Sequence, residues 1–319
     1  MAVTPEAAPA PAPSRRLPFK QLLLVLGVVA TVYAVALLVL SGSPRTALSL
    51  LWSWTGLQAA GLCLLNYVLR GTRWRYWMAH YGRNFSWRQG LRLYLAGYAF
   101  TPTPGNVGEA VRGLMLAKNP LGTAQSLAIF GAERLADLLC LVLLAIPAVI
   151  WAFSHGAVQA RPALLWGAIA AMVLALCLAA AVFAHYRLRL LKRFTWIGEA
   201  WHCLSVRPLH WFVLTLVAWA AQGTALWLLC GVLDLKLDLI TAMGFYAVAM
   251  VAGALSALPA GLGGMEAVLA GLLTLHGALP GYAMVITVLT RLLTLWLAVA
   301  MGVIALLYSA AIRKDISFS

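Results

Sequence analysis

The chain has 319 residues, of which 63% are hydrophobic and 10% are charged, and its formal net charge is +14. An ordinary soluble domain is about 45–50% apolar and about 25% charged, so this composition excludes that class and indicates an all-α polytopic membrane protein. The basic residues cluster between apolar runs, which favours a role in membrane topology over nucleic-acid binding. The six histidines have no metal-ligand spacing, so we expect neither a metal nor a cofactor.

Apolar runs long enough to cross a bilayer recur along the chain, because a spanning helix needs about 20 such residues. They begin after an Ala/Pro-rich tail, residues 1–17, which we expect to be disordered, and they end before a short tail, residues 313–319. Apolar residues at helical spacing also predict an amphipathic surface helix in 186–208. We predict about six full spans, at approximately residues 18–40, 47–69, 123–153, 162–185, 209–232 and 281–312.

A stretch of arginines interleaved with aromatic residues follows the second predicted span. Basic and aromatic residues together are typical of the interface between a membrane and water, where they face anionic lipid. The stretch either anchors the protein there or recruits an acidic headgroup, and the sequence leaves both open. The arginines of this predicted belt are Arg70, Arg73, Arg75, Arg88 and Arg92.

Two segments, 90–118 and 239–278, are apolar but cannot be ordinary spanning helices. Proline lacks the N–H that helix propagation needs, and glycine lowers helix propensity by about 1 kcal/mol. Each segment is therefore predicted to be a broken re-entrant hairpin or a pair of short helices, and in the first a new helix is expected with Glu109 in its first turn. Irregular backbone at membrane depth must face protein or a wet cavity. The helix-breaking residues are Pro104, Gly105, Gly108, Pro259, Gly261, Gly263 and Gly264.

The two broken segments resemble each other in sequence. Glu-Ala-Val follows the glycines in both, and each glutamate is followed 25 residues later by an arginine, Arg134 or Arg291. Lys and Arg concentrate in links that the positive-inside rule assigns to the cytoplasm, together with both termini. The first break then enters from the cytoplasm and the second from outside, so residues 18–160 and 161–312 are predicted to form an inverted repeat. Inverted repeats with discontinuous helices are typical of transporters.

Seven ionisable residues are predicted to lie at membrane depth, where each charge costs about 2.5–3.5 kcal/mol and must be paired or face a polar cavity. In one interpretation they are ion pairs that hold the two halves together, for example Glu109 with Arg134 and Glu266 with Arg291. In the other, the arginines bind a phosphate through paired hydrogen bonds. The candidate substrate-binding residues are Glu109, Arg112, Glu133, Arg134, Asp137, Glu266 and Arg291.

The chain resembles the flippase-like membrane domain of the lysylphosphatidylglycerol synthase family, a group of prokaryotic membrane proteins. The matching motifs are Trp74 to Tyr98, Pro104-Gly105…Gly108-Glu109…Arg112, Glu133-Arg134…Asp137, Leu258-Pro259…Gly261…Gly263-Gly264…Glu266, and Arg291. The resemblance implies the cytoplasmic (inner) membrane and translocation or handling of an anionic or polyisoprenoid-linked lipid. Because no soluble aminoacyl-transfer domain follows residue 312, we do not expect the chain to make the lipid itself.

The sequence therefore predicts a flippase-like transporter that moves an anionic phospholipid or a polyisoprenoid-phosphate-linked lipid between leaflets. One alternative is a small-anion channel or exchanger, since glycine-rich breaks and helix N-termini also suit small anions. Another is a non-transporting membrane partner of a lipid-modifying enzyme. A membrane-embedded enzyme is disfavoured, because the sequence shows no metal-ligand cluster and no serine or histidine placed with a catalytic partner.

Overall fold

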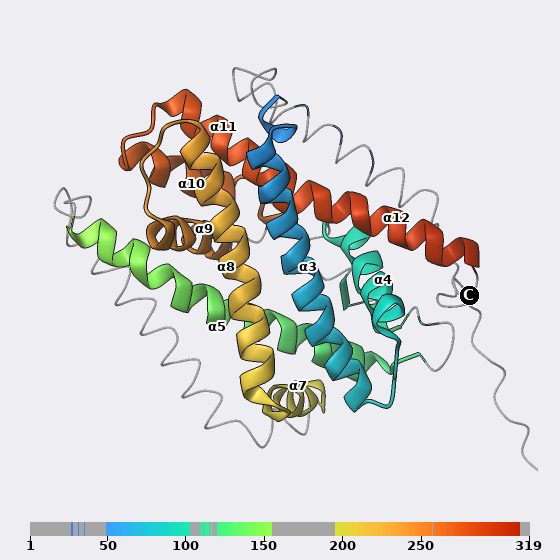
Figure 1. The fold of residues 1–319 in the computed structure, drawn as a ribbon. Helices are drawn as coiled ribbons and strands as arrows, with labels where there is room; N and C mark the ends of the chain where they lie inside the picture. Colours follow the sequence, from blue (N-terminus) through green and yellow to red (C-terminus); the bar gives the residue numbers. More distant parts are fainter. Residues whose placement is uncertain are drawn as a thin grey trace, which may run out of the picture.

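A computed structural model describes residues 27, 31, 35, 49–102, 109, 110, 112–114, 116, 120–154, 195–256 and 258–312 (Figure 1). Within these ranges the structure is helical and contains no strand. Its longer elements are α3 (Trp54–His80), α4 (Trp87–Gly97), α5 (Thr123–Ser154), α7 (Thr195–Ser205), α8 (Pro208–Val232), α9 (Leu239–Leu255), α10 (Gly264–Leu275), α11 (Pro280–Arg291) and α12 (Leu297–Ile312).

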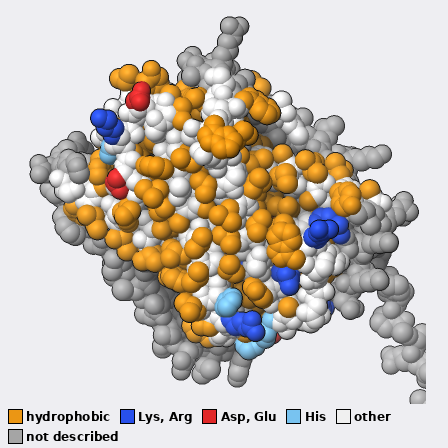
Figure 2. All heavy atoms as spheres, in the orientation of Figure 1, with side chains coloured by type: hydrophobic (Ala, Val, Ile, Leu, Met, Phe, Trp, Pro, Cys, Tyr) orange, Lys and Arg blue, Asp and Glu red, His pale blue; other side chains and the backbone are white. Residues whose placement is uncertain are grey.

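Three helical segments are long and apolar enough to cross a membrane: Thr123–Ser154, Pro208–Val232 and Pro280–Ser309. They coincide with three of the predicted spans. Hydrophobic side chains cover much of the face shown in Figure 2, and the charged and histidine side chains lie mostly toward its edges. The predicted span 162–185, both tails and nearly all of the predicted span 18–40 lie outside the described residues. The total of six spans and the inverted repeat therefore stay predictions.

Helix α3 differs from the sequence prediction, which ended the second span near residue 69. The structure continues one helix to His80, and its N-terminus is capped by Ser53, whose Oγ accepts a hydrogen bond from the Gly56 N–H. Arg70 and Arg73 lie inside this helix and are buried. The helix continues past them because both guanidinium groups find carboxylate partners in the protein interior.

In the second predicted break the structure has two short helices, α9 and α10, that pack against each other. Asp238 caps the N-terminus of α9 by accepting from two backbone N–H groups. Between α9 and α10 the chain forms a 3-10 turn, Pro259–Gly261, in which Ala260 has φ 53°, and Gly261 follows with φ 68°. A Cβ on Gly261 would lie 3.0 Å from the Gly253 backbone, so glycine permits both the conformation and the close return of the chain.

The first break differs from its prediction. Helix α4 ends at Gly97 and passes into a 3-10 turn, Tyr98–Phe100. Glu109 and Arg112 also lie in 3-10 turns, and the described residues between 98 and 122 contain no α-helix, so the helix expected to start near Glu109 is absent from this part. The predicted helix-breakers Pro104, Gly105 and Gly108 lie outside the described residues.

The expected surface helix in 186–208 is described only in part, as α7. It packs against α5, where Trp196 covers Gly131 and Ala200 is buried. Trp201 points outward and is largely exposed. The described part of the segment is therefore helical and docked on the long α5 helix.

One close approach places the first break against the C-terminal helix. Gly302 of α12 meets the end of α4, and a Cβ added at Gly302 would lie 2.4 Å from the Ala99 backbone nitrogen. Since neither backbone can yield cheaply, only glycine allows α12 to approach this corner so closely.

We predict that Gly302→Ala destabilises the protein by about 1–3 kcal/mol, because the added methyl group overpacks a backbone contact. The matched control is Gly271→Ala in α10, where a Cβ would meet nothing within 4 Å. This control is expected to be neutral or slightly stabilising, since alanine favours helix. Denaturant unfolding in detergent measures both, and equal midpoints for the two variants would contradict the steric argument.

Candidate functional site

A cluster of buried charges joins α3, α5 and the first break. Asp137 of α5 accepts from two arginines of α3: Arg70 Nη2 lies 2.6 Å from its Oδ2, and Arg73 Nη1 lies 2.8 Å from its Oδ1. Arg73 Nη1 also donates to Thr215 Oγ1, and Trp219 Nε1 donates to Asp137 Oδ1 at 3.3 Å. Helix α8 is thereby tied to the same carboxylate. Asp137 is thus a junction of three helices.

The other side of the cluster links the first break to α5. Arg112 lies between two glutamates: its Nη2 donates to Glu109 in a short hydrogen bond, and its Nη1 lies 3.1 Å from Glu133 Oε2. The same guanidinium packs 4.4 Å from the Tyr94 ring centroid, a cation–π contact. Thr101 donates to the second oxygen of Glu109 at 3.0 Å. These contacts hold Glu109 and Arg112 in place although neither sits in a regular α-helix.

A second, smaller cluster holds the second break. Arg291, at the end of α11, donates from Nε to Glu266 Oε1 at 2.6 Å and from Nη2 to the Ala260 carbonyl at 2.9 Å. Both ion pairs named from the sequence therefore form, since Arg134 Nη2 also lies 3.3 Å from Glu109 Oε2. Glu266 stands in the first turn of α10, where a negative charge is favoured by the helix dipole.

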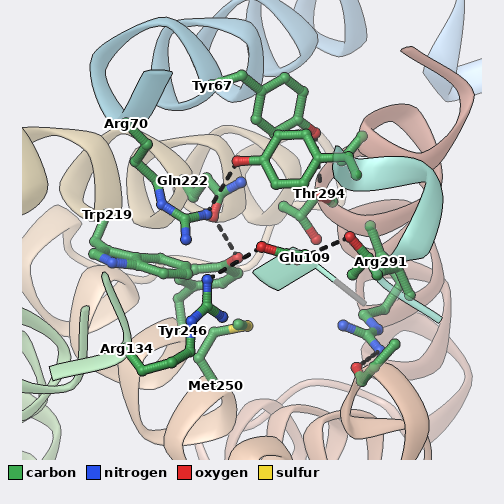
Figure 3. A pocket seen from close by; sticks show the side chains of 15 residues that line it. Tyr67, Arg70, Glu109, Arg134, Trp219, Gln222, Tyr246, Met250, Arg291 and Thr294 are labelled. Atoms are coloured by element: carbon green, nitrogen blue, oxygen red, sulfur yellow. Dashed lines mark hydrogen bonds and ion pairs between the residues drawn. The ribbon is translucent and has the colours of Figure 1, made fainter. Parts of the chain in front are cut away.

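A cavity of about 90 Å³ lies between the two clusters (Figure 3). Glu109, Arg134 and Arg291 line it. The break residue Ala260, whose carbonyl accepts from Arg291, lines it as well. We call it the chamber. Its lining residues are Tyr67, Arg70, Tyr98, Thr101, Glu109, Arg134, Trp219, Gln222, Tyr246, Met250, Ala260, Arg291, Thr294, Leu295 and Ala298.

The seven predicted substrate-binding residues are not equivalent in this geometry. Glu109, Arg134 and Arg291 line the chamber. Arg112 and Glu133 instead line a separate small space, which Glu109 also borders. Asp137 lines a neighbouring apolar compartment. Glu266 is buried and holds Arg291 from behind. The structure thus brings the set together but exposes only part of it to the chamber.

The predicted belt needs correction. Arg70 and Arg73 are buried and paired with Asp137, so they belong to the charged cluster and not to an exposed interface layer. Arg88 is exposed, Arg75 is half-buried, and Arg92 packs over the Tyr308 ring at 5.4 Å. The prediction was wrong because basic and aromatic residues alternate both in an interface layer and in this buried cluster. Only the contact with Asp137 on α5 distinguishes the buried arginines from interface arginines.

Several polar residues of the chamber were missed by the sequence reasoning. Tyr246 donates to Gln222 Oε1 at 2.8 Å, and Tyr67 donates to the backbone carbonyls of Leu293 and Thr294. These two carbonyls lie in a π-helical segment, Leu292–Trp296, which directly follows Arg291. A π segment disturbs the regular i−4 pattern and frees carbonyls for other donors. A glutamine in the middle of an apolar span was the available signal for Gln222.

Four arginines meet three carboxylates in the first cluster, counted over the residues that the structure describes. Arg291 and Glu266 balance each other in the second. The side chain of Arg134 is 32% exposed, whereas those of Arg70, Arg73 and Arg112 are at most 8% exposed. The surplus positive charge of the cluster is therefore accessible mainly through Arg134.

The fold and the site define an integral, helical membrane protein with a broken-helix hairpin and a buried, positively charged chamber. Residues 23–302 match the family model described as the lysylphosphatidylglycerol synthase TM region, and the chain belongs to this family. The chain is also similar to a UPF0104 membrane protein of Methanothermobacter thermautotrophicus, with 32% identity over 94 residues. That similarity covers 29% of this chain and 28% of the archaeal protein.

We predict that Asp137→Ala destabilises the protein by about 3–5 kcal/mol, because it leaves Arg70 and Arg73 buried without their closest carboxylate. Denaturant unfolding in detergent measures the loss. The control is Asp234→Asn in the exposed link before α9, where asparagine tolerates the observed φ of 55°. An Asp137→Ala midpoint equal to that of the control would show that the junction contributes little to stability.

Proposed function

We propose that this protein is a flippase-like transporter that moves an anionic phospholipid or a polyisoprenoid-phosphate-linked lipid between the leaflets of the cytoplasmic membrane. In this proposal both termini are cytoplasmic, and the protein does not itself modify the lipid. The observation that carries the proposal is the accessible guanidinium of Arg134 in a membrane-depth chamber that a broken helix helps to build.

Of the arginines in the cluster, Arg134 can form a new ion pair with an anion at the smallest loss of existing interactions. Its Nη2 lies 3.3 Å from Glu109 and 3.6 Å from Asp137, longer than the contacts that the other arginines make to the same carboxylates. If Arg134 turns toward a ligand, Glu109 keeps Arg112 and Asp137 keeps both arginines of α3. Neither acid is left unpaired in a poorly solvated site, which would otherwise be costly.

The charge and geometry of the chamber suit a phosphodiester. A singly charged phosphate would neutralise the surplus of one positive charge in the described cluster, and guanidinium binds phosphate through two parallel hydrogen bonds. Arg291 faces the same chamber from the second break and offers a second such group. Tyr98, Thr101 and Gln222 add neutral polar groups along the wall.

The broken segment supports movement as well as binding. Ala260 adopts a left-handed conformation that is unfavourable for a residue with a Cβ, and Arg291 donates to its carbonyl. An anion that draws Arg291 away would release this strained turn. Discontinuous helices that meet at a midplane site are the usual basis of alternating access. In the proposed cycle, the two halves rock about the chamber and expose the headgroup to one leaflet and then to the other.

We predict that Arg134→Gln lowers the rate of headgroup translocation about tenfold or more, because one charge-assisted hydrogen bond contributes about 1.5–3 kcal/mol. The assay follows exposure of a labelled phosphatidylglycerol headgroup on vesicles containing the reconstituted protein. Lys236→Gln, at an exposed position in the link before α9, is the control and should match the wild type. Wild-type rates for folded Arg134→Gln would remove this arginine from the mechanism.

A small-anion channel or exchanger is the second candidate, because a chamber of about 90 Å³ is closer in size to an inorganic anion than to a whole lipid headgroup. Efflux of chloride and inorganic phosphate from the same vesicles separates the two functions. A transporter of lipids is expected to leave both effluxes at the background of protein-free vesicles. Arg134-dependent efflux without headgroup translocation would favour the channel.

A further inference from the structure

A second hollow of about 240 Å³ adjoins the chamber between α5 and the α9–α10 hairpin. The two spaces are adjacent, because five residues line both of them: Arg134, Trp219, Met250, Ala260 and Arg291. We call the second one the apolar compartment. Beyond the shared residues its walls consist of Asp137, Leu138, Leu141, Val251, Gly253, Ala254, Gly261 and Met265.

Three of the residues that line the apolar compartment carry a charge. Arg134 and Arg291 belong to the border with the chamber, and the carboxylate of Asp137 is already paired with α3. The remaining lining is aliphatic side chains, methionine and small residues, together with the Trp219 ring. Enclosed apolar cavities of about 150 Å³ stay dry and bind hydrocarbons such as benzene. This compartment is larger, and its chemistry suits a hydrocarbon better than an inorganic ion.

The apolar compartment reaches the outer flank of the helices. Leu138 and Ala254 line it, and both are exposed on the surface of the described structure. Their neighbours Leu135, Leu139 and Leu255 are also exposed apolar side chains. A membrane helix with such a surface faces hydrocarbon, so the opening at Leu138 and Ala254 lies toward the bilayer and not toward water.

The opening follows from the way α5 and α9 cross. The helices touch where Gly244 meets Ala148, since a Cβ on Gly244 would lie 2.7 Å from the Ala148 nitrogen. About two turns further along, Leu141 of α5 and Val251 of α9 lie on opposite walls of the compartment. On the hairpin side, Gly253 approaches Met265 so closely that an added Cβ would lie 3.0 Å from the Met265 Cβ. The hairpin of the second break thus forms a tightly packed wall.

We propose that the apolar compartment is a binding subsite for one hydrocarbon chain of the lipid whose anionic headgroup lies against Arg134 in the chamber. The inference rests on the proposed function and adds the place and the path of the chain, which enters from the bilayer between α5 and the α9–α10 hairpin. A soluble anion has no group that fills this space. A charged chamber that shares a wall with an apolar space open to the bilayer matches an anionic amphiphile.

The test uses the full-length protein in phosphatidylcholine vesicles that contain phosphatidylglycerol with a diazirine in one acyl chain. After photolysis, mass spectrometry locates the labelled residues. We expect labelling of Leu141 and Met265, which are buried and line the compartment. Labelling confined to exposed residues such as Leu139 would instead report ordinary contact with the bilayer and would overturn the subsite.

Two pairs of variants test the opening, one pair on α5 and one on α9, and each pair consists of a blocking substitution and its control. Leu138→Trp is expected to reduce labelling of Leu141 and Met265 at least fivefold, whereas Leu139→Trp, on the neighbouring exposed position, leaves it unchanged. Ala254→Phe and its control Leu255→Phe repeat the comparison on α9, so that a folding defect in one pair leaves the other decisive. Equal labelling within both pairs would contradict entry between these helices.

Arg134→Gln separates this inference from the proposed function. Loss of Leu141 and Met265 labelling in this variant, with transport also lost, supports the headgroup and chain sites together. Arg134-dependent transport with the chain labelling other buried residues would overturn the subsite and leave the transporter intact. Labelling at Leu141 and Met265 without any translocation would overturn the transporter and leave a lipid-binding membrane protein.

Discussion

The buried carboxylate of Asp137 is the contact on which the rest of the described structure depends. It lies within hydrogen-bonding distance of Arg70 and Arg73 on α3 and of Trp219 on α8, while it belongs to α5. Buried charges are expensive unless they are paired, so one acid holds three helices in one arrangement. Both carboxylates near Arg134, those of Glu109 and Asp137, also pair with another arginine.

This arrangement explains how a chamber can be charged and still stable. Arg112 forms ion pairs with both Glu109 and Glu133 and also packs against aromatic rings. The second break presents Arg291 from the opposite direction, held by Glu266 and by a backbone carbonyl. The proposed binding site for an anion rests on this arrangement, because Arg134 and Arg291, from separate segments, line one space.

The apolar compartment places a mainly hydrophobic space beside the charged chamber. Its border with the chamber includes Arg134 and Arg291, and apart from Asp137 and the Trp219 ring its other lining residues are aliphatic, methionine or glycine. An anionic amphiphile likewise has a charged headgroup joined to a hydrocarbon chain. The family that the chain belongs to is defined by its membrane region. The proposed path of the hydrocarbon chain gives the broken hairpin of this region a specific role, because the hairpin forms one wall of the entry.

Much of the fold and part of the site could be predicted from local sequence alone. Apolar run length predicts the three candidate spans, and Pro259 with Gly261 and Gly263 predicts the second break, because these properties depend on nearest neighbours in the chain. The repeated spacing between glutamate and arginine indicates the ion pairs of Glu109 with Arg134 and of Glu266 with Arg291. Each charge needed a partner, and few residues of the opposite sign were present.

Only the tertiary structure decided which charges face the chamber. Arg70 and Arg73 resemble interface arginines in sequence, and they are buried because α5 places Asp137 beside them. The π segment after Arg291 and the irregular backbone around Glu109 likewise depend on Tyr67, Thr101 and Arg112, whose positions are set by other elements. A sequence states how many charges must be paired in the membrane, but the pairing itself depends on distances between helices that are remote along the chain.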